Sequence, residues 1–244
     1  KKTRTDSDLI GSREVPESAL YGVQTLRGIE NFRISKFHLN EYPLFIQALA
    51  ITKMGAAVAN RELDLLTEEQ ADAILKACKE ILEGKHHDQF PVDMIQGGAG
   101  TTTNMNANEV IANRALELMG HQRGEYQYCS PNDHVNRSQS TNDAYPTAIH
   151  IGLYYTHLKL VKHFEVLIES FRKKATEFAH VIKMGRTQLE DAVPMTLGQT
   201  FNGFASILRH EVKNLEYASH DILTVNIGAT AIGTGITADP ENAQ

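Results

Sequence analysis

The segment IGLYYTHLKLVKHFEVLIESFRKKATEF occupies residues 151–178 and carries apolar side chains spaced by three residues, by four, or by their sum. This spacing places the apolar side chains on one face of an α-helix, as in the seam of a helical bundle. A helix that starts near Pro146 runs roughly 35 residues, or about 50 Å. A compact domain of this chain's size is only about 45 Å across, so the seam favours a bundle shared between subunits. The seam residues are Leu153, Leu160, Phe164, Leu167, Phe171, Ala175 and Phe178.

A second long helix is predicted after Pro194, where Thr196 and Gln199 form a capping-box pattern. Between the two long helices, HVIKMGRTQLEDAVP at residues 180–194 predicts a short strand or an extended turn. Further helices are expected over residues 44–63, over residues 67–84 behind a second capping box, and over residues 105–119. Residues 1–40 show no sustained period and are expected to be irregular. The apolar seam of the second helix comprises Leu197, Phe201, Phe204, Leu208, Val212, Leu215, Ile222 and Val225.

These elements predict a mainly α fold in two parts. Residues 1–143 are expected to form an α-rich N-terminal domain with few short strands, and residues 144–244 the first part of a central helical bundle domain. The chain holds no helices to partner the two long seams. Asp239, Pro240 and Glu241 form a helix-start pattern that is followed by almost no helix. We therefore expect the sequence to be a truncated portion of a longer chain.

Composition narrows the class of protein. Among 244 residues, 24 Lys and Arg stand against 30 Asp and Glu, for a formal net charge of −6, which argues against nucleic acid as the main partner. Two cysteines cannot form a disulfide framework, and no apolar run is long enough to span a bilayer. We expect a cytoplasmic protein that binds neither nucleic acid nor membrane.

Three polar clusters are candidates for a binding site. They are Thr101–Asn104 behind a glycine loop, Ser138–Asp143 just before the first long helix, and Gly185–Gln188 between the long helices. Two of them precede predicted helices, where free backbone N–H groups and the helix dipole favour an anion. Their neutral donors can bind a carboxylate and stabilise charge that grows on it. The alternative is that the Ser, Thr and Asn side chains only cap helices.

A proton-transfer group is not evident in the sequence. There is no set of nucleophile, histidine and acid, no clear carboxylate pair and no histidine or cysteine spacing suited to zinc. The glycine loop lacks the Lys-Ser/Thr of a nucleotide-binding P-loop. His134 fits either a proton carrier or a structural hydrogen-bonding residue. The residues alone predict part of a site that recognises a small acid.

At these clusters the chain resembles the aspartase/fumarase superfamily, over essentially all of its residues. The matching segments are GSREVPESALYGVQTLR, DQFPVDMIQGGAGTTTNMNANEVIANRALELMG, PNDHVNRSQSTNDAYPTA, KMGRTQLEDAVPMTLGQ and GATAIGTG. Three details favour the aspartase branch over class II fumarases, which usually have His at position 188, Ser at 141 and His at 130, where this chain has Gln188, Thr141 and Ser130. Many aspartases also have His at position 188, so Gln188, which cannot carry a charge, is a departure.

The resemblance implies reversible anti elimination of ammonia from L-aspartate to give fumarate. Thr101, Ser140 and Thr141 would bind the carboxylate on which charge develops, and Asn142, Thr187 and Gln188 would hold the amino side. The general base of the family is a serine on a mobile loop whose motif is absent here, so it is expected beyond residue 244 and this chain alone is expected to be inactive. The alternatives are a class II fumarate hydratase and a non-catalytic scaffold.

The resemblance also implies partners and cofactors. Members of the superfamily form homotetramers through a central helix bundle, and each active site is assembled from three subunits. No organic cofactor is implied. A divalent cation such as Mg²⁺ activates some relatives, and no metal site is assigned to residues of this chain.

Overall fold

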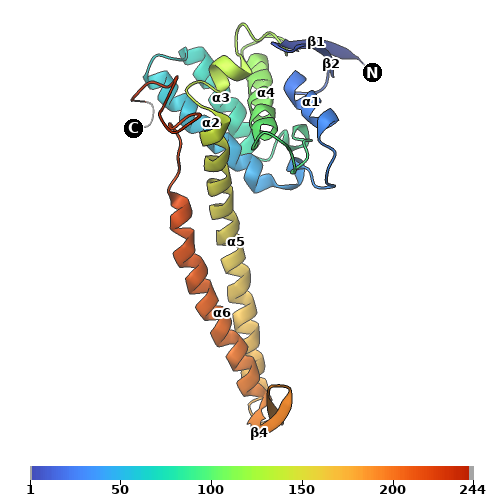
Figure 1. Cartoon of the computed structure of the whole chain (residues 1–244), viewed down its shortest axis with the longest axis vertical. Coiled ribbons are helices and arrows are strands. Elements are labelled where there is room, and N and C mark those ends of the chain that lie inside the picture. The colour runs from blue at the N-terminus through green and yellow to red at the C-terminus, as the bar shows by residue number, and fades with distance from the viewer. Residues whose placement is uncertain (1, 242–244) are drawn as a thin grey trace. The chain divides into compact units, whose positions relative to one another are not determined.

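The computed structural model describes residues 2–241 (Figure 1). Its contacts divide the chain into two compact units, one formed by residues 1–152 with 225–244 and the other by residues 153–224. Both units consist mainly of helices joined by turns, with two short antiparallel hairpins. The predicted mainly α fold is confirmed. The proposed domain division after residue 143 differs from these contact-based units and stays a prediction.

Three helices form the core of the first unit: α2 (Pro43–Glu62), α3 (Glu68–Leu82) and α4 (Thr101–Leu118), with α3 packed against both others. Local signals begin and end α3 as the sequence predicts. The Thr67 hydroxyl accepts from the Gln70 backbone N–H, the Gln70 side chain accepts from the Thr67 N–H, and Gly84 follows the helix with φ of 87°. Cys78 is fully buried in this core, and burial raises the pKa of its thiol to about 12. It is therefore a small core side chain, as expected.

Two strands and a helix form within residues 2–40, contrary to the sequence-based expectation of an irregular segment. Strands β1 (Thr3–Asp8) and β2 (Gly11–Pro16) form an antiparallel hairpin, which lies beside α1 (Val23–Asn31) in Figure 1. The hydroxyls of Thr3 and Thr5 both donate to the Glu14 carboxylate across the hairpin at 2.6 Å. These cross-strand polar pairs stabilise the hairpin. Its strands have little of the apolar–polar alternation from which a strand is predicted in a sequence.

Helix α1 begins where a distant carboxylate meets it. Glu109 of α4 accepts backbone N–H groups of Gly22, Gln24 and Thr25 at 2.9, 2.8 and 3.0 Å. A carboxylate in this position satisfies amides that the helix leaves unpaired. Gly22 makes the approach possible, because a Cβ there would lie 2.9 Å from the Glu109 carboxyl carbon. The capping group is more than eighty positions away in sequence, so no local pattern predicts this helix.

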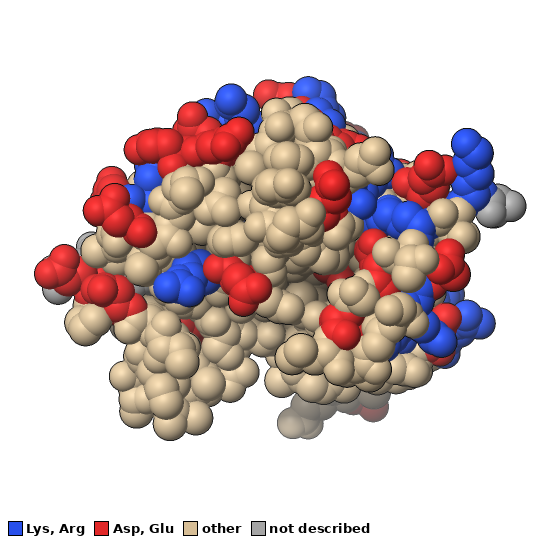
Figure 2. Space-filling model, turned by 90° about the horizontal axis from the view of Figure 1, so that it is seen from above, with Lys and Arg blue, Asp and Glu red and all other residues tan. Residues whose placement is uncertain are grey.

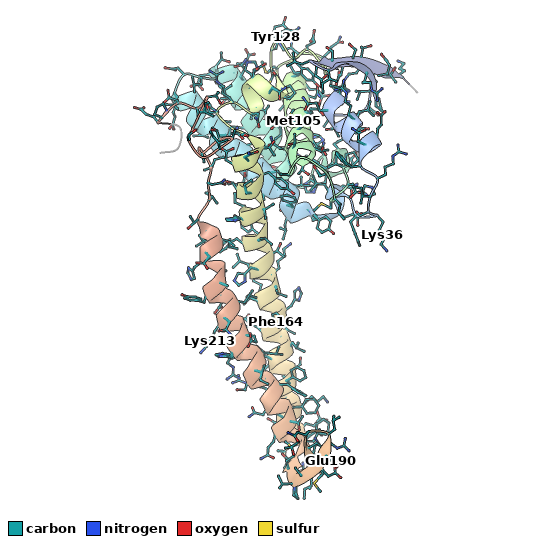
Figure 3. The ribbon with its side chains drawn as sticks, viewed as in Figure 1. Lys36, Met105, Tyr128, Phe164, Glu190 and Lys213 are labelled. Carbon is teal, nitrogen blue, oxygen red and sulfur yellow. The ribbon has the colours of Figure 1, made fainter. Side chains whose placement is uncertain are left out.

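The second unit contains most of α5 (Thr141–Glu177), the hairpin of β3 (Ile182–Thr187) and β4 (Glu190–Thr196), and α6 (Leu197–Ser219). Phe171 of α5 lies 6.0 Å from Phe201 and 5.6 Å from Phe204 of α6, between ring centroids. Phe164 lies on α5, Lys213 on α6 and Glu190 at the hairpin (Figure 3). The capping box of Thr196 and Gln199 is confirmed at the start of α6. The extended segment predicted between the long helices is a hairpin.

Three predicted helix boundaries are wrong. Helix α4 begins at Thr101 and not near Met105, so the threonines form its first turn. Helix α6 ends at Ser219, so Ile222 lies in the short 3₁₀ helix η4 (Asp221–Leu223) and Val225 lies beyond it. The predicted helix start, Asp239–Glu241, lies in a turn where the Glu241 backbone N–H donates to Asp239 Oδ1 at 2.9 Å, and any helix that follows falls on residues 242–244, outside the described residues.

The third wrong boundary is that of α5, which begins at Thr141, with Pro146 inside it. Because proline has no N–H, the carbonyl of Asn142 loses its usual helical partner. The side-chain amide of Asn226 donates to that carbonyl at 3.1 Å and replaces the missing bond. The remaining short helices are η1 (Leu39–Glu41), η2 (His87–Gln89) and a π turn, η3 (Pro131–Val135).

Surface character agrees with the composition. On the face drawn in Figure 2, acidic and basic side chains are interspersed. Within residues 2–241, no helix has the length and apolar character to cross a membrane. In the second unit several large apolar side chains of α5 and α6 are exposed, among them Leu153, Val166, Phe204 and Ile207. The expectation of partner helices in a shared bundle stays a prediction.

Candidate functional site

The beginnings of α4 and α5 meet in the first unit. We call the predicted site residues at this point, Thr101, Ser140, Thr141 and Asn142, the first-unit cluster. Gly98 and Gly100 adopt positive φ values of 74° and 91° and turn the chain into α4. A Cβ on Gly100 would lie 2.4 Å from Cδ1 of Tyr145, so only glycine lets this tyrosine ring lie against the start of α4. Gly100 has no side chain to cap α4, and Oε1 of Gln96 accepts the Thr103 backbone N–H of the first turn at 2.9 Å. Two helix N-termini thus meet, an arrangement that favours an anion.

Four of the six predicted site residues belong to this meeting point. Thr101 is exposed at the first position of α4, and its hydroxyl donates to the Gly98 carbonyl at 2.6 Å. Thr141 is half-buried at the first position of α5 and follows the half-buried Ser140. Asn142 is exposed, and its side-chain amide donates to the Ala231 carbonyl at 2.6 Å. The structure therefore gathers Thr101, Ser140, Thr141 and Asn142 around two adjacent helix ends.

A buried lysine lies beneath the cluster. Lys53 of α2 is 1% exposed, and its Nζ donates to side-chain oxygens of Asn104, Asn136 and Gln139 at 2.8, 3.0 and 2.9 Å. Burial lowers the pKa of Lys53 to about 7, while the Asp143 carboxylate acts in the opposite direction. Hydrogen bonds to three carbonyl oxygens favour the ammonium form. Lys53 is absent from the residues predicted for the site, although it is the only charged residue in the mainly apolar segment LFIQALAITKMGAAVAN and was therefore a usable signal.

A buried aspartate also lies next to the cluster. Asp143 is fully buried, and its carboxylate accepts the backbone N–H groups of Ser140, Gly228 and Thr230 at 2.9, 3.2 and 2.8 Å. The loop GATAIGTG, residues 228–235, is thereby fastened to the start of α5. Glycines 228, 233 and 235 in this loop adopt positive φ, as expected of a glycine loop. Asp143 was predicted only as a member of its cluster, and the structure shows that it orders the backbone around Ser140.

The other two predicted residues belong to the second unit. Thr187 ends β3 and pairs with Glu190 of β4, so Gln188 and Leu189 form a two-residue hairpin turn. Both turn residues adopt positive φ, 48° and 69°, which side chains other than glycine seldom do. Positive φ at both positions is what a two-residue type I′ hairpin turn requires, so the turn itself accounts for these angles. Thr187 and Gln188 belong to the second unit, and their joint action with the first-unit cluster stays a prediction.

His134 takes part in local hydrogen bonding. Its Nδ1 accepts the backbone N–H of Ser130 at 2.7 Å, and its Nε2 lies 3.3 Å from Nε2 of Gln70. Burial lowers its pKa, an effect that Asp133 partly opposes. These contacts favour the structural alternative for His134 over the proton carrier.

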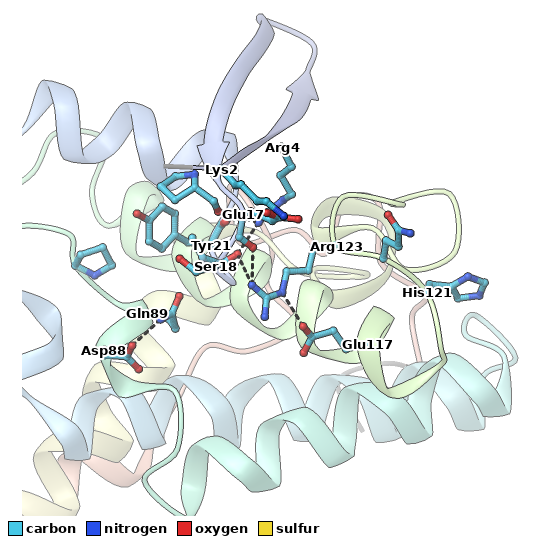
Figure 4. A pocket seen from close by; sticks show the side chains of 14 residues that line it. Lys2, Arg4, Glu17, Ser18, Tyr21, Asp88, Gln89, Glu117, His121 and Arg123 are labelled. Carbon is cyan, nitrogen blue, oxygen red and sulfur yellow. Dashed lines mark hydrogen bonds and ion pairs between the residues drawn. The ribbon is translucent and has the colours of Figure 1, made fainter.

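A large open pocket of the first unit is separate from the cluster. It measures about 1120 Å³ and is lined by residues such as Arg4, Glu17, Glu117, His121 and Arg123 (Figure 4). Its two arginines already have partners, because Arg123 bonds the Glu117 carboxylate at 2.6 Å and the Glu17 carbonyl at 2.8 Å, and Arg4 bonds the Asp6 carboxylate at 3.0 Å. Charges that are already paired offer little to a substrate carboxylate, so we do not place the site here. Across residues 2–241, no group of three or more His, Cys, Asp or Glu side chains is placed to hold a metal ion.

Comparison with known proteins gives consistent relatives. A family model described as lyase matches residues 11–244. The aspartate ammonia-lyase of Pseudomonas canavaninivorans is 58% identical over 97% of this chain and 50% of its own length. That of Escherichia coli strain K12 is 56% identical over 98% of this chain and 50% of its own length. The chain spans about half the length of the curated relatives it matches, in agreement with the expectation of a portion of a longer protein.

Solved structures agree with the fold. A fumarate lyase:delta crystallin from Brucella melitensis bound to cobalt superposes with a TM-score of 0.93 at 50% identity, over 99% of this chain and 53% of that one. A class II fumarase from Schistosoma mansoni superposes with a TM-score of 0.89 at 36% identity, over 99% of this chain and 50% of that one.

Proposed function

Because the chain belongs to the lyase family whose model matches residues 11–244, we propose that the whole protein is an aspartate ammonia-lyase and that this chain is its N-terminal half. The relatives that carry this name are 55–58% identical over almost the whole chain. The reaction is reversible anti elimination. A base removes a proton from the carbon beside the side-chain carboxylate, the C–N bond breaks, and fumarate and ammonium are formed.

The observation that carries the proposal is the neutral donor cluster at two helix ends. Ser140, Thr141 and, after its hydroxyl turns from Gly98, Thr101 bind the side-chain carboxylate of L-aspartate. Removal of the proton puts a second negative charge on this carboxylate. Neutral hydroxyls and helix N-termini stabilise that added charge more than the single charge of the substrate, which lowers the barrier.

The amino side of the substrate is bound by Asn142, Thr187 and Gln188. The Nδ2 group of Asn142 is held by the Ala231 carbonyl, which leaves Oδ1 to accept from the substrate ammonium. Gln188 offers an amide oxygen for the same purpose and carries no charge. We propose that Thr187 and Gln188 act in a site assembled from several subunits of a homotetramer, whose bundle covers the exposed apolar faces of α5 and α6.

The resemblance to the superfamily implies that the base is a serine on a loop whose motif this chain lacks, so we propose a general-base serine outside residues 1–244. This chain alone is then inactive. The proposed reaction needs no organic cofactor, and we propose a cytoplasmic location. The second candidate is class II fumarate hydratase, which the Schistosoma mansoni structure favours at lower identity. The third is a non-catalytic scaffold.

The test uses the whole protein with L-aspartate, and fumarate is followed by its ultraviolet absorbance. Production of fumarate from L-aspartate supports the proposal. Dehydration of L-malate without turnover of L-aspartate would replace it by the fumarase alternative, and loss of both activities by the scaffold. Residues 1–244 are then assayed alone and with the remaining polypeptide added in trans. Turnover by residues 1–244 alone would refute the placement of the base.

A further inference from the structure

Lys53 controls which way three amide side chains face. An ammonium group donates hydrogen bonds and accepts none, and Nζ of Lys53 lies 2.8 to 3.0 Å from Asn104, Asn136 and Gln139. Each amide must therefore turn its oxygen towards the lysine. An amide turned the other way would bring its own N–H donors against the ammonium, with a buried clash of like partial charges.

The orientation of the Asn104 amide determines which hydrogen bond it makes to Thr141 of the first-unit cluster. With its Oδ1 on Lys53, its Nδ2 group points the other way and donates to Oγ1 of Thr141 at 3.2 Å and to Oδ1 of Asn136 at 3.1 Å. The Thr141 hydroxyl therefore accepts a hydrogen bond on the protein side. Its single proton is then directed elsewhere.

We propose that Lys53 and Asn104 are positioning residues that keep the hydroxyl of Thr141 as a donor towards the substrate carboxylate. The inference rests on the proposed function and deepens it. A hydroxyl that could equally donate to the protein would lose part of its value when charge grows on the carboxylate. The directed chain Lys53–Asn104–Thr141 removes that competition before the substrate arrives.

The decisive variant is Asn104→Asp in the whole protein. The new carboxylate keeps an oxygen for Lys53 but has no N–H for Thr141, so it accepts the Thr141 proton and turns the hydroxyl away from the substrate. We expect kcat/KM for L-aspartate to fall roughly 10- to 100-fold, the range for one hydrogen bond to a charged group. The loss should fall mainly on kcat, since the interaction strengthens in the transition state.

Asn108→Asp is the matched control. Asn108 lies one turn further along α4, is equally buried, and its Nδ2 donates to Asn136 Oδ1 at 3.1 Å and to Met105 Sδ at 3.4 Å. Asn108→Asp therefore places the same new carboxylate next to Asn136, but one helical turn away from Thr141. We expect kcat/KM within about threefold of wild type, allowing for ordinary structural effects. Equal loss in both variants would overturn the inference and indicate a general structural effect.

A double-mutant cycle tests whether Asn104 acts through the hydroxyl of Thr141. In a Thr141→Val background, Asn104→Asp should cost little further activity, because the hydroxyl whose direction it changes is gone. Full additivity would overturn the inference.

Neutron diffraction of the deuterated protein tests the polarity without reference to activity. An Nδ2–D of Asn104 directed at Thr141 supports the inference, and a Thr141 deuteron directed at Asn104 overturns it. Failure of the wild type to convert L-aspartate would instead refute the proposed function.

Discussion

The Asp143→Asn substitution should destabilise the first unit through a buried carboxylate that three backbone N–H groups share. Two of these amides, from Gly228 and Thr230, bond Oδ2, and the Ser140 amide bonds Oδ1. An asparagine best keeps its single oxygen at the doubly bonded position. Its NH₂ group then faces the N–H of Ser140, so one charge-assisted bond is lost and a buried donor is left without an acceptor.

The size of the effect follows from these terms. One hydrogen bond to a charged group contributes about 1.5–3 kcal/mol, and a buried donor without an acceptor costs about 1–3 kcal/mol. Since the two terms overlap, we expect the free energy of unfolding to fall by about 3 kcal/mol. For a chain of this size each kcal/mol lowers Tm by roughly 2–4 °C, so Tm should fall by about 6–12 °C.

The assay compares thermal unfolding of wild type, Asp143→Asn and the control Asp133→Asn. Asp133 is exposed and bonds the hydroxyl of the nearby Ser130 at 3.0 Å, so its substitution should cost less than about 1 kcal/mol. Thermolysin provides a local readout, because Ile232 is exposed in the loop that Asp143 fastens and Ile236 is exposed just after it. Cleavage there should accelerate in Asp143→Asn alone. Equal shifts in Tm for both variants, or unchanged cleavage, would refute the reasoning.

Three further outcomes are expected. Gly100→Ala should lower the free energy of unfolding by about 2–4 kcal/mol, because its φ is positive and a Cβ meets Tyr145 at 2.4 Å. Gly120→Ala, which has positive φ but open space around it, should lower it by about 1 kcal/mol. Equal losses in the two variants would contradict this account. Pairing with Arg114 and His86 holds the pKa of Glu80 at about 2, below its usual 4.5, so its contribution is complete above pH 4.5 and disappears towards pH 2. Urea titrations should therefore show Glu80→Gln about 1 kcal/mol less stable at pH 7 and equal to wild type near pH 2; a constant difference across this range would be inconsistent. Thr187→Val in the whole protein should lower kcat for L-aspartate roughly 10- to 100-fold with Tm nearly unchanged, and parallel losses of both would remove Thr187 from the site.

The elements that the sequence predicts well are those whose signals are local. The capping boxes at Thr67 and Thr196 mark the starts of α3 and α6 correctly, because their hydrogen bonds connect residues three positions apart. The apolar periods of α2, α5 and α6 likewise follow from the 3.6-residue turn of the helix. Four of the six candidate site residues were placed at helix beginnings for the same reason, although Thr101 and Thr141 lie inside the first turns.

Helix α1 and the beginning of α5 depend on distant partners. Glu109 supplies the cap of α1 from α4, and Asn226 replaces the bond that Pro146 denies to Asn142. A pattern read along the chain contains neither contact, since both partners lie more than eighty residues away in sequence.

By itself, then, the sequence determined a mainly helical chain, its glycine loops and a set of neutral donors suited to a small acid, since helix caps, periodicity and residue chemistry are local properties. Only the tertiary structure decided how those donors are organised. In the local sequence Lys53 is an ordinary charged residue, and Asp143 resembles an ordinary helix cap. Folding buries both beneath the same cluster, where each charge must be satisfied by amides from other segments. The cost of leaving a buried charge unpaired is what makes their partners, and through them the direction of Thr141, so strictly defined.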